Sequence, residues 1–368
     1  MSAPARDREP GGGASAMKAR ASAQGEPPID GLARAYLTPA RVATTLAILA
    51  AILIAMAIVA AAFGSVHISL IRAVADRASA DHAILFGVRM PRVLLGAIVG
   101  AVLAAVGAAL QALVRNPLAE GGILGISGGG AFGAIVAMVI FSRLGGADAM
   151  VPLCAFAGAL LSTLAVYRLA LVDGRLEPFT LLLVGVIFNS FWGAAIMLVN
   201  SVVNFYFTHS IIFWLMGSFE APTWREVAMV AVIGSAGCAV LITRARDLNL
   251  LSLGDDEAAE LGVEVDALRR TIFAVTSIMI GAAVSVSGII SFVGLIVPHI
   301  LRVTLGADHR LLIPASILGG AAFTVAADLI ARVAIAPAEL PVGAITALCG
   351  GPFFIYVLRR EGRKALAS

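Results

Sequence analysis

Ten long apolar stretches between about residue 42 and residue 358 dominate this sequence, and almost no charge interrupts them. Hydrophobic residues make up 60% of the chain and charged residues 13%, and the mean hydropathy is +0.97. The apolar core of a bilayer is about 30 Å thick, so a helix that crosses it needs about 20 apolar residues and satisfies its own backbone hydrogen bonds. The pattern therefore predicts an all-α polytopic membrane protein embedded in a lipid bilayer.

The limits of the apolar stretches place about ten transmembrane helices. They run approximately over 42–64, 93–114, 122–142, 150–171, 179–200, 226–243, 271–288, 290–305, 312–334 and 342–358. Only Ser287 and Gly288 separate the seventh from the eighth, so a short or re-entrant helix there is an alternative to two full spans. On the second helix, small residues recur every fourth position from Gly96 to Ala108, a stripe that lets helix backbones approach closely.

The two ends of the chain differ from this apolar region. Residues 1–40 are rich in Gly, Ala, Ser, Pro, Arg and Glu without apolar periodicity, which predicts a disordered tail. The transmembrane domain then covers 41–360, and residues 361–368 form a short C-terminal tail. An even number of spans puts both tails on the same side of the membrane.

The basic residues indicate which side that is. Outside the first 20 residues, the side of the termini holds Arg34, Arg41, Arg115, Arg168, Arg175, Arg244, Arg246, Arg269, Arg270, Arg302, Arg310, Arg359, Arg360, Arg363 and Lys364. The opposite side holds Arg72, Arg77, Arg89, Arg92, Arg143, Arg225 and Arg332. Since Lys and Arg are enriched in short cytoplasmic loops, both termini are expected in the cytoplasm. No basic patch on a folded domain points to nucleic-acid binding.

The charge pattern also bears on the energy source. Ion-coupled carriers place ionisable groups at mid-membrane, whereas Asp328 and Arg332 fall near the outer end of the ninth span and His299 and Arg302 near the inner end of the eighth. A P-loop needs a lysine after a glycine-rich turn, and the only lysines are Lys18 and Lys364, both in the tails. If transport is active, ATP is therefore hydrolysed by another polypeptide. A secondary carrier working alone and a membrane scaffold without transport are the alternatives.

The longest internal cytoplasmic segment, Arg244 to Arg270, is a candidate docking point for such a motor. Ser252 precedes Asp255 at capping-box spacing, an acidic run suits the positive end of a helix dipole, and Gly262 offers a C-terminal stop. A second short turn is expected over 263–268. We assign ATPase coupling to segment 247–268, and within it to Leu253, Gly254, Asp255, Glu257, Ala258, Leu261 and Gly262. The alternative is a solvated loop helix without a special role.

Several segments in order resemble one family of membrane permeases. They are R-M-P-R at 89–92, Q-A-L-V-R-N-P-L-A at 111–119, G-I-L-G-I-S at 122–127, W-L-M-G-S at 214–218, the stretch 248–262, S-F-V-G-L-I-V-P-H at 291–299, D-H-R at 308–310 and A-E-L-P-V-G at 338–343. Together they resemble the FecCD family, the permease subunits of ABC importers for vitamin B12, haem and iron-siderophores. The likeness covers residues 42 to 360.

This resemblance implies an assembly. It implies a homodimer of ten-helix protomers with an inverted repeat, helices two to five against seven to ten, in the bacterial inner (cytoplasmic) membrane. Two ATP-binding-cassette ATPase subunits, which use ATP and Mg, would lie below, and a periplasmic substrate-binding protein above. The chain itself would be no enzyme and would bind no cofactor and no metal.

The resemblance also assigns roles to residues. Arg89, Arg92 and Arg332 would dock on acidic residues of the binding protein, since guanidinium groups pair with carboxylates in a bidentate way. The alternative for these arginines is snorkelling to lipid headgroups.

Two further groups belong to the pathway by the same resemblance. The turn after Arg115 would place Asn116 and Leu118 at a cytoplasmic gate, with Thr180 as a further gate residue, although a simple turn at Pro117 also explains that sequence. The fifth helix would line the pathway through Phe188, Asn189, Phe191, Trp192 and Met197, and packing is the alternative for these side chains.

The transported compound is the least constrained feature. We expect an iron chelate and name haem first, because segments 308–310 and 334–339 are similar to those of haem permeases. Vitamin B12 and ferric siderophores are the alternatives.

Overall fold

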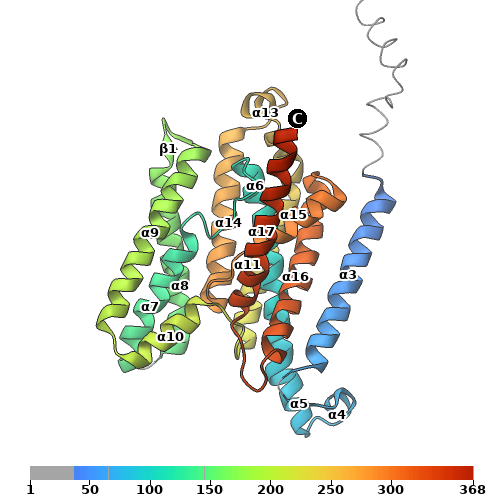
Figure 1. The fold of residues 1–368 in the computed structure, drawn as a ribbon, viewed down its shortest axis with the longest axis vertical. Coiled ribbons are helices and arrows are strands. Elements are labelled where there is room, and N and C mark those ends of the chain that lie inside the picture. Colours follow the sequence, from blue (N-terminus) through green and yellow to red (C-terminus); the bar gives the residue numbers. More distant parts are fainter. Residues whose placement is uncertain (1–36, 65, 145, 368) are drawn as a thin grey trace, which may run out of the picture. The chain divides into compact units, whose positions relative to one another are not determined.

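The computed structural model describes residues 37–64, 66–144 and 146–367 (Figure 1). Within them the chain is almost entirely helical, and its β-structure is one antiparallel hairpin of β1 (Leu171–Val172) and β2 (Arg175–Leu176). The described residues from Leu46 onward form one compact unit. Residues 1–36 of the predicted N-terminal tail lie outside the described residues, and helix α3 already begins at Pro39.

The prediction of an all-α polytopic membrane protein is confirmed. Among the described residues, seven helices are long and apolar enough to cross a membrane, and three shorter apolar helices accompany them. The long ones are α3 (Pro39–Ala62), α6 (Met90–Leu113), α8 (Ala147–Leu169), α9 (Pro178–Val202), α11 (Trp224–Thr243), α14 (Val265–Ser287) and α16 (His309–Val333). The shorter ones are α7 (Ile126–Leu144), α15 (Val293–Leu305) and α17 (Val342–Ala367), whose apolar part ends at Val357.

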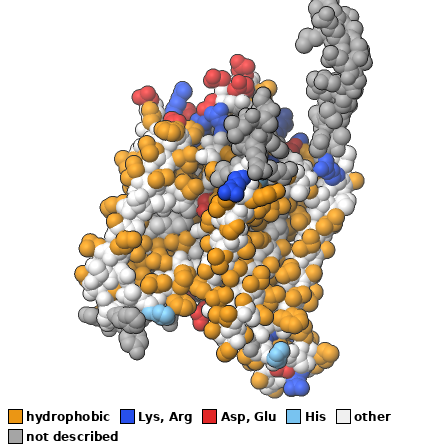
Figure 2. Space-filling model, in the orientation of Figure 1, with side chains coloured by type: hydrophobic (Ala, Val, Ile, Leu, Met, Phe, Trp, Pro, Cys, Tyr) orange, Lys and Arg blue, Asp and Glu red, His pale blue; other side chains and the backbone are white. Residues whose placement is uncertain are grey.

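The remaining helices lie at the two ends of the compact unit. At one end are α4 (Leu70–Ala75) and α5 (Ala80–Ile84), which a π-helical turn, η1 (Leu85–Arg89), joins to α6. At the opposite end are α12 (Ala245–Leu251) and α13 (Asp255–Glu260). Helix α10 (Phe205–Leu215) follows α9 and lies toward the end that holds α4 and α5 (Figure 1). We call these the α4–α5 end and the α13 end. Figure 2 shows hydrophobic side chains on the flank between them and acidic and basic side chains gathered at the α13 end.

The eighth predicted span is a short helix. Helix α15 has 13 residues, which at 1.5 Å per residue is about 20 Å and is too short for a bilayer core of about 30 Å. Gly288, with φ 66°, ends α14, and Phe292, with φ 68°, precedes α15. The structure therefore supports the alternative of a short helix after the break at Ser287 and Gly288, in place of a second full span.

Helix α6 lies at the centre of the compact unit and is buried along most of its length. It packs against α11, α14, α15 and α16. Its small residues permit this: a Cβ on Gly100 would collide with the backbone of Gly320 on α16, and one on Gly107 with the backbone of Gly294 on α15. The stripe of small residues on the second predicted helix is thus a packing surface, as expected.

The predicted coupling segment forms two helices at the α13 end, but its capping differs from the prediction. The Ser252 hydroxyl donates back to the carbonyl oxygen of Leu248 at 2.9 Å and closes α12, so the expected capping box with Asp255 is wrong. Gly254, with φ 151°, precedes α13 instead. The helix stop at Gly262 is confirmed by its φ of 88°. The short turn expected over 263–268 is largely the first part of α14, which begins at Val265.

Candidate functional site

The turn that follows α6 carries the predicted gate residues Asn116 and Leu118. Arg115 adopts φ 49°, and the Asn116 side-chain oxygen accepts a hydrogen bond from the backbone N–H of Leu118 at 2.9 Å. This is an Asx turn, which an Asn before Pro117 favours because the proline restricts the residue that precedes it. The turn leaves Leu118 exposed at the α13 end, as a gate residue facing a partner requires.

An ionic bridge joins this turn to the coupling segment. Asp255 Oδ1, at the start of α13, accepts from the Arg115 guanidinium at 2.5 Å and from that of Arg269 on α14 at 2.8 Å. Arg269 is buried, whereas Arg115 and Asp255 are partly exposed. One carboxylate oxygen therefore ties the first residue of α13 to two elements of the membrane domain.

The start of α9 faces the same place. A cavity of about 730 Å³ is lined by residues of the turn, of β1 and β2, of α9 and of the bridge, among them Asn116, Pro117, Glu177, Asp255 and Arg269. Glu177 caps α9 by accepting from the backbone N–H groups of Phe179, at 3.0 Å, and Thr180. Desolvation alone would raise the pKa of Glu177, but these hydrogen bonds and the charge of Arg269 hold it below its ordinary value.

Thr180 thus lies at the N-terminus of α9, near the cavity that also receives Asn116. The structure brings all three predicted gate positions to the α13 end, where Asn116 lines the cavity and Thr180 lies beside it. Their role as a gate stays a prediction, since it depends on how two protomers meet.

The predicted lining residues of α9 divide into two groups. The Asn189 amide donates to the carbonyl oxygens of Gly122 and Ile123, at 2.7 and 3.1 Å, and the Trp192 indole N–H donates to Ser162 Oγ at 2.9 Å. These two side chains therefore fasten α9 to α8 and to the loop before α7.

The other three lining candidates, Phe188, Phe191 and Met197, have apolar side chains that form no hydrogen bonds. Phe188 is half-buried against Phe191 and Trp192, whereas Phe191 and Met197 are 57% and 75% exposed. Phe191 and Met197 are therefore available to a pathway or to a second protomer, and lining stays a prediction for all five residues.

At the α4–α5 end, the three predicted docking arginines are buried. The Nε of Arg92 donates to Asp328 Oδ1 at 2.9 Å, and the Nε of Arg332 donates to Asp328 Oδ2 at 3.0 Å. Arg92 also pairs with Glu339 at 2.6 Å. Arg89 donates to the carbonyl oxygens of Ala61 and Ala62, at 2.7 Å each.

This cluster differs from the sequence expectation, which treated the arginines as charges displayed on the outer face. Each guanidinium satisfies its donors inside the protomer, because an unpaired charge at this depth is costly. Docking on a binding protein stays a prediction. The internal partner Asp328 could have been found from its position four residues before Arg332 on one helix, and Glu339 from its place in the A-E-L-P segment.

Two polar side chains that sequence reasoning missed join the halves of the membrane domain. Gln111 on α6 donates to the carbonyl oxygen of Gly294 at 3.1 Å and accepts from Arg302 on α15 at 2.7 Å. Glu120, in the loop before α7, accepts from the backbone N–H of Phe292 at 3.0 Å and so caps α15. Desolvation raises the pKa of the Glu120 carboxyl to about 7, against the smaller opposing effect of that hydrogen bond.

Among the described residues, no group of three or more His, Cys, Asp or Glu side chains lies close enough to hold a metal ion. The ionisable groups described above are instead paired with one another or with the backbone. The expectation that the chain binds no metal or cofactor stays a prediction.

The fold and these sites define a class: a multi-helix membrane protein whose polar bridges lie at the two ends of an apolar helical unit. The sequence matches the FecCD transport family over residues 48–360, which is most of the chain. This protein belongs to the FecCD transport family, and it is a permease subunit of an ABC importer.

Similar proteins agree with this family. The chain is 44% identical over 281 residues to the cobalamin import system permease protein BtuC of Halobacterium salinarum, which covers 76% of this chain and 74% of that protein. It is 39% identical to the hemin transport system permease protein HmuU of Yersinia pestis, over 76% of this chain and 84% of that one. It is also similar to a solved inward-facing structure of a metal-chelate type ABC transporter, with a TM-score of 0.76 and 30% identity over 86% of this chain and 99% of that chain.

Proposed function

We propose that this permease passes haem from a periplasmic binding protein to the cytoplasm, driven by ATP and Mg on separate ATPase subunits. The observation that carries the import function is the family match over residues 48–360. Haem is supported by the 39% identity to the hemin permease of Yersinia pestis, and it is the compound that the resemblance of segments 308–310 and 334–339 led us to expect.

Vitamin B12 is the second candidate compound, because the cobalamin permease of Halobacterium salinarum is 44% identical to this chain. A ferric hydroxamate siderophore is the third, since the iron(3+)-hydroxamate permease FhuB of Bacillus subtilis is 39% identical.

The substrate is tested in liposomes that hold the permease, its ATPase and its binding protein. We expect ATP-dependent accumulation of haem and no accumulation with a hydrolysis-deficient ATPase. Accumulation of cobalamin or ferric hydroxamate in place of haem would show that the accumulated compound, and not haem, is the substrate. Uptake without any ATPase would favour an ion-coupled carrier.

We infer that the segment 247–268 receives the ATPase. Ala258 is buried and holds α13 on the membrane domain, whereas Leu253 and Leu261 are 65% and 59% exposed beside the acidic residues of α13. A partner protein that covers this end would remove both apolar side chains from water, which favours binding. In this proposal Leu253 and Leu261 contact the ATPase, and the bridge from Asp255 to Arg115 carries its movement to the gate at Asn116 and Leu118.

We further propose a homodimer in the bacterial inner membrane, with both termini cytoplasmic. Phe191 and Met197, exposed on α9, then face the second protomer or the pathway between the two copies. Cross-linking of gate positions, described in the Discussion, tests this arrangement.

For the binding protein, docking at the α4–α5 end remains our proposal for Arg89, Arg92 and Arg332. Glu339, whose side chain is 32% exposed, is the most accessible internal partner of this cluster. A carboxylate of the binding protein would take the place of Glu339 on Arg92, which exchanges one charged pair for another without leaving a guanidinium unpaired.

A further inference from the structure

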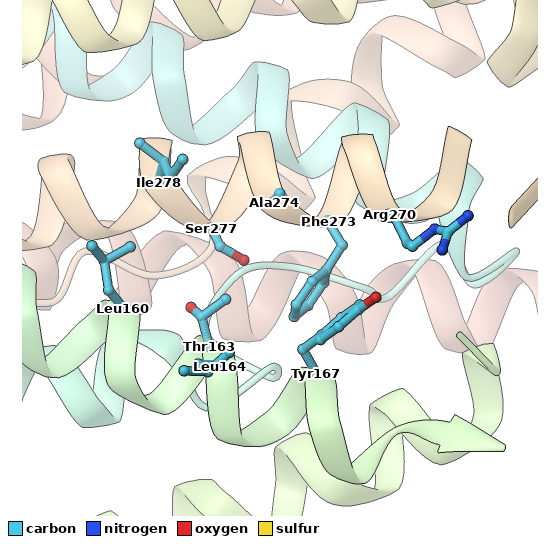
Figure 3. Close-up of a pocket in the computed structure, with 9 residues that line it drawn as sticks. All are labelled: Leu160, Thr163, Leu164, Tyr167, Arg270, Phe273, Ala274, Ser277 and Ile278. Atoms are coloured by element: carbon cyan, nitrogen blue, oxygen red, sulfur yellow. The ribbon is translucent and has the colours of Figure 1, made fainter. Parts of the chain in front are cut away.

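A groove between α8 and α14 shares no lining residue with the cavity at Asn116, with the bridge at Asp255 or with the arginine cluster. It has a volume of about 340 Å³ and is lined from α8 by Leu160, Thr163, Leu164 and Tyr167, and from α14 by Arg270, Phe273, Ala274, Ser277 and Ile278 (Figure 3). From Arg270 to Ile278 the groove follows α14 for about 12 Å, at 1.5 Å per residue. Its length and apolar walls suit an extended hydrocarbon chain.

The groove is polar at one end only. Figure 3 shows the Arg270 guanidinium and the Tyr167 hydroxyl at the same end, with Leu160 and Ile278 at the other. Arg270 belongs to the first turns of α14, next to the α13 end that the basic residues assign to the cytoplasm. A cation at the end of an apolar groove between membrane helices matches the headgroup level of a lipid leaflet.

The donors at this end are available for a ligand. Arg270 uses its Nε to donate to the backbone carbonyl of Asp266 at 3.2 Å, and within the described residues its terminal amino groups and the Tyr167 hydroxyl have no partner. The Tyr167 ring packs on Phe273 with centroids 6.1 Å apart, which fixes its hydroxyl beside the groove. Deeper in the groove, Ser277 is 1% exposed and its hydroxyl also lacks a hydrogen-bond partner among the described residues.

We propose that this groove binds one acyl chain of an anionic glycerophospholipid, with the lipid phosphate on Arg270 and the Tyr167 hydroxyl. A lipid with a net negative charge fits better than a zwitterionic one, because the cationic group of the latter would approach Arg270. The proposal concerns lipid binding by the protomer and does not depend on which compound the importer carries.

Native mass spectrometry of the full-length protein tests this, after exchange into detergent with equal amounts of phosphatidylglycerol and phosphatidylcholine. Wild-type protein is expected to retain phosphatidylglycerol preferentially. Arg270→Gln should lower that retention about fivefold, the effect of one basic residue near an anionic lipid, and Tyr167→Phe should lower it less. Arg246→Gln, which removes an exposed arginine from α12 at the same end, is the matched control and should leave retention unchanged.

A second variant tests the groove itself. Ala274 lies among the lining residues and is exposed, so Ala274→Phe should fill the groove and reduce retention while Arg270 is intact. Equal retention of the two lipids, equal losses in Arg270→Gln and Arg246→Gln, or unchanged retention in Ala274→Phe would each overturn the proposal. So would efficient cross-linking of Leu164→Cys between two protomers, because a second copy would then cover the groove.

Discussion

Arg115 and Asp255 are 140 positions apart in the sequence, yet a guanidinium nitrogen of Arg115 lies 2.5 Å from Asp255 Oδ1. Arg115 opens the turn that holds Asn116 and Leu118, and Asp255 opens α13, the helix we assign to the ATPase contact. The same carboxylate oxygen also accepts from Arg269 on α14, so one contact point joins α13 to the turn and to α14.

The first prediction concerns this bridge. Arg115→Gln is expected to reduce ATP-driven uptake severalfold while the ATPase stays bound, because the turn no longer follows α13. The free energy of unfolding should fall by no more than about 1 kcal/mol, since the pair is partly exposed. Uptake and ATPase co-purification from the same preparation measure both effects.

Arg244→Gln is the matched control. Arg244 pairs with Asp247 at 3.2 Å at the same end, but this pair lies within one helical turn and reaches no gate residue. Equal uptake in the two variants would remove the bridge from the coupling mechanism.

The second prediction concerns the shape of the coupling segment. Gly254→Pro should uncouple hydrolysis from transport or release the ATPase, because proline cannot adopt the φ of 151° found there. Leu261→Asp should do the same by placing a charge on an exposed apolar contact. Glu260→Gln, a change at a neighbouring exposed residue, should retain both activities. Wild-type uptake by the first two variants in liposomes would assign coupling to another segment.

The third prediction concerns the gate. In a two-fold dimer, a residue close to the axis lies close to its own copy, so Asn116→Cys and Leu118→Cys are expected to cross-link between protomers without nucleotide. The yield should change when ATP is bound but not hydrolysed. Cys154, Cys238 and Cys349, which are free in the structure, are first replaced. If neither position cross-links in any nucleotide state, with Thr180→Cys tested alongside, other residues form the gate.

The fourth prediction concerns the arginine cluster. Arg92→Glu should destabilise the protein by about 3–5 kcal/mol, because it removes a buried partner of Asp328 and adds a negative charge beside Asp328 and Glu339. This differs from what the sequence alone suggests, which is a surface charge whose reversal affects docking only. Arg72→Glu at the same end, where the Arg72 side chain is 68% exposed, should change stability little. Thermal unfolding in detergent compares the two, and equal shifts would contradict the buried network.

The fifth prediction concerns pH. The pKa of Glu120 is about 7 in the folded protein against an ordinary 4.5, so the folded state holds this proton more tightly than the unfolded state. Its contribution is therefore fully present below about pH 4.5 and is lost as the pH rises through 7, a difference of roughly 3 kcal/mol. Glu120→Gln should flatten the fall in unfolding temperature between pH 5 and 8, whereas Glu220→Gln at an exposed position should not. An unchanged pH profile in Glu120→Gln would show that another group titrates.

The helical class and most element positions could be predicted from the sequence, because membrane spans depend on local composition. A run such as Val42 to Gly64 is apolar along its whole length, and no partner elsewhere in the chain is needed to decide that it forms a helix. The residues that begin and end the helices were less predictable. Gly262 stops α13 as expected, but Ser252 closes α12 instead of capping α13, because a hydroxyl can bond to the turn before it as well as to the turn after it.

The pairings of charged residues were decided by tertiary structure. Arg92 is buried against Asp328, which lies 236 positions later in the sequence. Nothing in the residues next to Arg92 shows that it is buried and not exposed at a membrane surface. The same holds for Arg115 with Asp255 and for Glu120 with Phe292. The sequence determined which segments enter the membrane, since that depends on apolar area summed over one helix. Which charges meet depends on how the helices pack, and close contacts such as Gly100 with Gly320 arise only in the folded chain.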